Sequence, residues 1–120
     1  MLVSLLLGCG PRCVEVDESC TPQYEPTFDE VYANTLAPSC ALEGCHGGDG
    51  GHHGMDLSGT PDEVYSTLVE GGYVVPGEPG CGKVVVHVES TGGAQMPPGS
   101  PLAEEERCAL RTWIAEGALR

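Results

Sequence analysis

Positive charge is scarce in this sequence. Only 5 of its 120 residues are Lys or Arg, against 18 Asp or Glu, so the formal net charge is −13. Nucleic-acid binding needs a basic face, and adhesion to anionic lipid through a basic patch needs clustered cations. The composition argues against both functions. It favours a soluble surface that attracts a partner protein with a basic face.

Aromatic side chains are also few, at 5% of the chain, with one Trp and one Phe. These side chains supply little apolar volume for a conventional hydrophobic core. The 18 Gly and 10 Pro favour turns over long regular elements. The length suits one domain. Such a chain needs further stabilisation, from a buried apolar group or from disulfides.

Motifs for catalysis on a substrate are missing from the sequence. No Ser/His/Asp set and no paired-carboxylate pattern is present. The glycine-rich run at 47–54 lacks the preceding strand and the Lys-Ser/Thr of a phosphate-binding loop. We therefore expect no enzyme activity.

Cysteine is the residue type that indicates the chemistry of this chain. There are seven cysteines, and two of them, Cys40 and Cys45, precede His46. Two thiols followed at once by His are typical of covalent haem attachment, in which each thiol adds to a vinyl group and the His ligates the iron. The usual spacing is two residues between the cysteines, and here it is four. A local Cys40–Cys45 disulfide and a metal site built from both thiolates and His46 are the alternatives.

Six short segments extend this motif over most of the chain: 28–31, 45–47, 54–58, 74–77, 96–98 and 113–118. Their order and spacing resemble the class I cytochrome c-like domains of planctomycete and myxobacterial envelope proteins. The resemblance implies an all-α fold of three to four short helices around one haem c, with long Gly/Pro-rich loops. It implies a periplasmic or envelope one-electron carrier, free or serving a larger oxidoreductase. The alternative is a haem-free structural or interaction lipoprotein on the same scaffold, with Cys40–Cys45 as a disulfide.

The same resemblance implies His46 and Met96 as the two axial ligands of the iron. Met96 lies in a loop before the last helix, and Pro97 and Pro98 reduce the entropy lost when that loop is ordered. Met96 packing on the haem edge is the alternative role. Met55 matches a packing position. The remaining histidines are weaker candidates for ligation: His52, His53 and His87.

Capping patterns predict where helices begin. Thr27 with Glu30 predicts a helix over 28–36 that Pro38 ends, and Thr60 with Glu63 predicts one from Pro61 to about 70. A last helix is expected over 102–116. The β-branched run 83–88 favours a strand by propensity, whereas the resemblance implies a short helix there. It also implies that the first helix packs beside the last.

The amino-terminal end is expected to serve as an anchor. Residues 1–8 are apolar and too few to cross a bilayer, which needs about 20 residues. Leu6-Leu-Gly-Cys9 resembles a bacterial lipoprotein cleavage box, so 1–8 is interpreted as a truncated signal segment and Cys9 as the lipidated residue. An unmodified Cys9 is the alternative. Residues 9–26 are expected to be an acidic tether, and 27–120 the cytochrome c-like domain, with the membrane contacted only through the lipid.

Four cysteines remain for disulfides once Cys9 is assigned to lipid and Cys40 and Cys45 to haem. Closeness in sequence favours Cys13–Cys20, which leaves Cys81–Cys108 as the second pair. The second bond would hold the loop that carries Met96. Pairing of Cys13 or Cys20 with a more distant cysteine stays open at this point.

Overall fold

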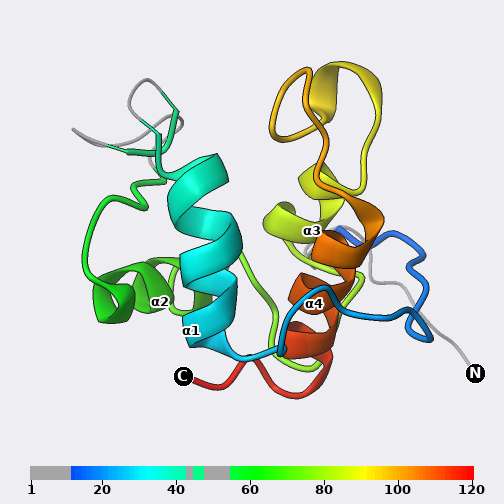
Figure 1. The fold of residues 1–120 in the computed structure, drawn as a ribbon, viewed down its shortest axis with the longest axis horizontal. Helices are drawn as coiled ribbons and strands as arrows, with labels where there is room; N and C mark the ends of the chain where they lie inside the picture. Colours follow the sequence, from blue (N-terminus) through cyan, green and yellow to red (C-terminus); the bar gives the residue numbers. More distant parts are fainter. Residues whose placement is uncertain (1–11, 43–44, 48–54) are drawn as a thin grey trace, which may run out of the picture.

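The chain forms a small helical fold, shown in Figure 1. The computed structural model describes residues 12–42, 45–47 and 55–120. Within these ranges there is no strand, and the elements are α1 (Phe28–Val31), η1 (Tyr32–Cys40), α2 (Pro61–Val69), α3 (Lys83–Val88), η2 (Gly92–Ala94) and α4 (Glu104–Ala115). The expectation of a small all-α protein with long connecting loops is confirmed for this part of the chain. No helix described here is long and apolar enough to cross a membrane.

The first helix continues further than its sequence predicts. Thr27 caps α1 by accepting from the backbone N–H of Glu30, but the Glu30 carboxylate bonds Asn34, so only half of the expected capping box forms. The prediction that Pro38 ends the helix is wrong, because the chain widens into the π-helix η1 and carries on to Cys40. In an α-helix the Pro ring would clash with the carbonyl four residues earlier. A π-helix bonds residues five apart, as the Ala41 N–H and the Leu36 carbonyl do at 2.8 Å, and so shifts that carbonyl.

The next two helices follow their expectations more closely. At α2 the full capping box is present, with Thr60 and Glu63 bonding each other's backbone N–H. The run 83–88 forms the helix α3, as the resemblance implies, with Gly82 as its N-cap. Three of its valines are buried, so packing outweighs the strand propensity of the run: Val85, Val86 and Val88.

The core is built around α1 and α4. The Phe28 and Trp113 ring centroids lie 5.4 Å apart, and Tyr65 of α2 meets Phe28 edge-on at 5.2 Å. Leu110 and Ile114 are buried on the same face of α4 as Trp113. The expected packing of the first helix beside the last is confirmed.

A strap, defined here as residues 12–26, binds the side of the fold that carries α3 and α4 (Figure 1, blue). Disulfides join Cys13 to Cys81 and Cys20 to Cys108. The predicted pairs Cys13–Cys20 and Cys81–Cys108 are therefore wrong.

Backbone pairing explains why each strap cysteine bonds a distant partner. Near Cys13, the Val14 N–H donates to the Gly80 carbonyl at 2.7 Å, and near Cys20 the Gln23 N–H donates to the Glu105 carbonyl at 2.9 Å. The strap thus presents one thiol beside α3 and the other beside α4. Residues 12–26 are consequently part of the folded domain.

Candidate haem-attachment site

Cys40 and Cys45 are both free thiols, whereas the four cysteines described elsewhere are in disulfides. Cys40 ends η1 and is half-buried, while Cys45 is exposed. The pKa of the Cys40 thiol is raised to about 11, mainly by burial and to a smaller extent by the negative charges of Glu106 and Cys45. Cys40 is therefore a neutral thiol near pH 7.

The four-residue spacing does not separate the two ends of the motif. The His46 N–H donates to the Cys40 carbonyl at 3.2 Å, and the N–H groups of Cys45 and Gly47 both donate to the Leu42 carbonyl. The chain therefore leaves at Cys40 and returns beside it at His46. This closure brings Cys40 and His46 together despite the longer insert.

His46 is oriented by a contact that its sequence neighbours do not reveal. Its Nδ1 lies 2.9 Å from the Met55 carbonyl oxygen, and the Leu57 N–H donates to the His46 carbonyl at 2.5 Å. A carbonyl oxygen only accepts, so Nδ1 carries the proton and Nε2 of the neutral ring keeps a lone pair. Histidines that ligate metals usually have this arrangement, which fixes the tautomer and the ring. The Met55 side chain packs against the core, as expected.

Met96 lies half-buried in the loop between α3 and α4. Its N–H donates to the His87 carbonyl at 3.0 Å, and Nδ1 of His87 lies 2.7 Å from the Ala94 carbonyl oxygen. The His87 ring thus holds the middle of the loop. In Figure 1 this loop and the carboxyl end of η1 both lie at the upper end of the molecule, on opposite sides.

A clamp of two arginines and two glutamates closes the base of this loop. Arg111 donates to Glu89, before the loop, at 2.5 Å, and to Glu104, after it, at 2.6 Å. Arg107 bonds the same two carboxylates, and the Arg111 side chain is only 2% exposed. Burial alone would lower the pKa of Arg111, but the bonds to Glu104 and Glu89 outweigh it and raise that pKa, so the charge is retained.

Sequence reasoning missed this clamp. Glu104, Arg107 and Arg111 recur at helical spacing on α4, which is a signal for pairing along one face. The partner Glu89 belongs to the end of α3, and no sequence pattern connects it to Arg111.

Three candidate residues lie outside the residues that the structure describes: Cys9, His52 and His53. Within the described ranges no group of three or more His, Cys, Asp or Glu side chains could hold a metal ion. The alternative of a protein-only metal site at Cys40, Cys45 and His46 therefore gains no support.

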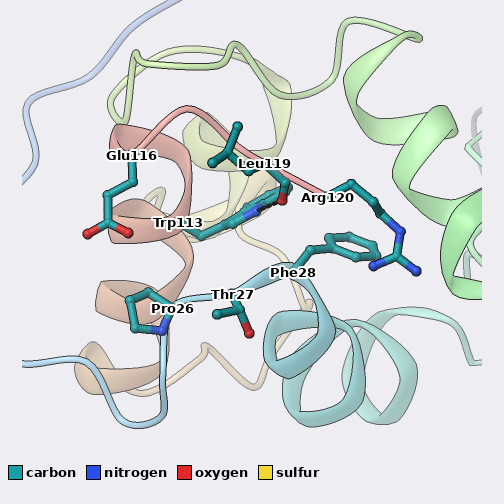
Figure 2. Close-up of a pocket in the computed structure, with 7 residues that line it drawn as sticks. All are labelled: Pro26, Thr27, Phe28, Trp113, Glu116, Leu119 and Arg120. Atoms are coloured by element: carbon teal, nitrogen blue, oxygen red, sulfur yellow. Dashed lines mark hydrogen bonds between the residues drawn. The ribbon is translucent and has the colours of Figure 1, made fainter.

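A separate pocket of about 180 Å³ lies where α1 begins and the chain ends (Figure 2). Its lining residues are Pro26, Thr27, Phe28, Trp113, Glu116, Leu119 and Arg120. Phe28 and Trp113 are core residues, and the Arg120 guanidinium lies 5.1 Å from the Phe28 ring centroid. The pocket is smaller than the several hundred Å³ usual for a cofactor and includes none of the motif residues.

Comparison with known proteins gave no matching family model, no matching curated protein and no matching solved structure.

Proposed function

We propose that this protein is a monohaem c-type cytochrome of a bacterial envelope that carries single electrons. The observation that carries the proposal is His46: its Nδ1 is engaged by the Met55 carbonyl, and it directly follows one of two free thiols. Cys40 and Cys45 would hold haem c through thioethers, and His46 would ligate its iron. Bound haem supplies a reversible Fe(III)/Fe(II) couple, so no enzyme activity of the chain itself is needed.

The redox state of the cysteines supports the proposal. Cys13, Cys20, Cys81 and Cys108 are in disulfides, which indicates an oxidising compartment. In such a compartment two neighbouring thiols tend to oxidise. The raised pKa of Cys40 lowers its thiolate fraction and slows that reaction. The pair would then remain available for addition to the haem vinyl groups.

Met96 is proposed as the second axial ligand. Its thioether is soft and uncharged, so it would favour Fe(II) and raise the reduction potential. The bonds from His87 and the clamp at Glu89 and Glu104 order the loop that carries it. His87 is the alternative ligand, because its Nδ1 also lies against a backbone carbonyl.

In the cell, the protein would be anchored by a lipid on Cys9 and would exchange electrons with a partner that has a basic face. The net charge of −13 supports electrostatic steering toward such a partner. Replacing Cys9 by Ser should move the protein from the membrane fraction to the soluble fraction. Unchanged fractionation of that variant would count against lipidation.

Mass spectrometry after expression with a c-type maturation system tests the haem proposal. We expect the mass of one haem on the denatured chain, with both Cys40 and Cys45 modified, and no bis-thioether product from a Cys45→Ser control. A chain without haem, carrying a Cys40–Cys45 disulfide, would refute electron transfer. It would identify the haem-free structural lipoprotein instead.

The Met96 assignment has its own test. In Met96→Ala we expect the sulfur-to-iron charge-transfer band to disappear and the potential to fall by about 0.1 V or more, within the range that axial ligands control. The matched control is Met55→Leu, which should keep both. An unchanged spectrum in Met96→Ala would transfer the assignment to His87 or to an open site.

A further inference from the structure

The Lys and Arg side chains of this protein differ in whether they form ion pairs. Arg107 and Arg111 bind Glu89 and Glu104, and Arg120 binds Asp29 and Asp62. The other two, Arg12 and Lys83, are exposed and form no ion pair with any carboxylate that the structure describes. The Lys83 ammonium lies instead 5.8 Å from the Tyr73 ring centroid.

These two unpaired cations lie at one place on the surface, named here the strap corner. Arg12 precedes Cys13 and Lys83 follows Gly82, and the Gly82 N–H donates to the Arg12 carbonyl at 2.9 Å. The Cys13–Cys81 disulfide, with its Cα atoms 4.0 Å apart, locks the two segments together.

Three exposed acids, Glu15, Asp17 and Glu78, come within five residues of Arg12 or Lys83 in the chain. With the two cations they give the strap corner a formal charge of −1. The remaining −12 of the net charge of −13 is carried by the rest of the molecule. The strap corner is thus close to neutral on a strongly acidic protein.

The strap corner is also the attachment point closest to Cys9. Only three residues lie between Cys9 and Cys13, so Cys13 is four residues along the chain and at most about 14 Å from Cys9 when fully extended. Cys13 is fixed by its disulfide and Val14 by its hydrogen bond to Gly80. The length of chain between Cys9 and the fold therefore ends at Cys13. An 18-residue free tether, as the sequence suggested, would have reached about 60 Å.

We propose that the strap corner is the face that the domain turns toward an anionic lipid bilayer. The proposal rests on the proposed lipid at Cys9, which keeps the corner within about 14 Å of the surface. Headgroup phosphates attract Arg12 and Lys83 within a Debye length of about 8–10 Å and repel the acid-rich remainder. The lipid supplies the adhesion, and the charges select the orientation.

This orientation has a consequence for partner access. Figure 1 shows the strap and α3 on one side of the molecule and η1, which ends at Cys40, on the other. With the strap corner toward the membrane, the η1 side faces the aqueous phase. The site would then be reached by a partner in solution.

Lys83 is the sole lysine of the chain, so a water-soluble amine-reactive reagent reports on it directly. The experiment labels the full, lipidated chain in vesicles containing phosphatidylglycerol and again in detergent, and quantifies the labelled peptide. We expect Lys83 to react at least about tenfold more slowly in the vesicles. Equal rates would overturn the proposed orientation.

Two controls separate orientation from general shielding. Ala33→Lys places a second amine on an exposed position of η1, and this amine should react equally fast in both samples. Arg12→Gln should weaken the protection of Lys83, whereas Gln23→Glu, which changes the net charge equally on the same strap, should not. Slowed labelling at position 33, or equal effects of the two charge variants, would also overturn the proposal.

Vesicle flotation and haem mass, measured on the same sample, distinguish the possible failures. A chain that does not float has no lipid anchor, which refutes both the anchor and the membrane-facing corner. A chain that floats with unprotected Lys83 refutes the orientation alone. The haem mass reports separately on electron transfer.

Discussion

Arg111 and Glu89 form an ion pair 2.5 Å long between α4 and the end of α3, with the Arg111 side chain 2% exposed. Arg111 also binds Glu104, so one guanidinium joins the two ends of the loop that carries Met96. A buried cation with two carboxylate partners fixes the relative position of those partners. The geometry of the loop is thereby tied to the stability of α4.

Arg111→Leu should destabilise the fold. Removing one partner of a buried pair leaves carboxylates uncompensated, and because Glu104 is 48% exposed we expect about 2–3 kcal/mol, the lower end of such losses. Urea denaturation measures the change. Arg120→Ala is the control, since its exposed pairs with Asp29 and Asp62 should contribute little. Equal midpoints for the two variants would contradict the buried clamp.

The disulfide pairing predicts a definite peptide map. Digestion without reductant should give one product linking the peptides of Cys13 and Cys81 and another linking those of Cys20 and Cys108. Reduction should separate both products. A peptide closed by Cys13–Cys20 would show that the strap is a local loop and not part of the domain.

The two motif thiols should differ in reactivity before haem is attached. Alkylation proceeds through the thiolate, and a pKa of about 11 leaves about one Cys40 in a thousand ionised at pH 8. Cys45 is exposed, so iodoacetamide should modify it first in the native haem-free chain. Both should react in urea. Equally fast native labelling would contradict the burial of Cys40.

Stability of the haem-free chain should fall at alkaline pH. The pKa of Cys40 is raised from 9.0 to about 11, so above pH 9 the unfolded chain loses this proton while the native chain keeps it. The protonated Cys40 thiol stabilises the native chain fully below pH 9, and this stabilisation is lost as the pH rises through about 11. The free energy of unfolding should fall by at most about 2–3 kcal/mol over this range. Urea titrations at several pH values measure the slope, which Cys40→Ala should reduce. An unchanged slope would exclude Cys40 as its source.

Local signals in the sequence were sufficient for several elements. The Thr60 and Glu63 box starts α2 because a cap needs only its own first turn. Leu110, Trp113 and Ile114 recur at helical spacing in the sequence and are buried on one face of α4, since helical periodicity is local as well. The motif Cys40, Cys45 and His46 was likewise readable from the residues alone.

Other features were decided only by tertiary structure. The Cys13–Cys81 and Cys20–Cys108 bonds depend on where the strap lies against α3 and α4, and thiol spacing in the sequence carries no such information. The extension of η1 through Pro38 required a wider helix that the α-helical rule for Pro does not describe. The contacts of Arg111 with Glu89 and of His46 with Met55 join segments that are separate in the sequence. Such contacts form because packing buries polar groups, and a buried polar group needs a hydrogen-bond partner from whichever segment lies beside it.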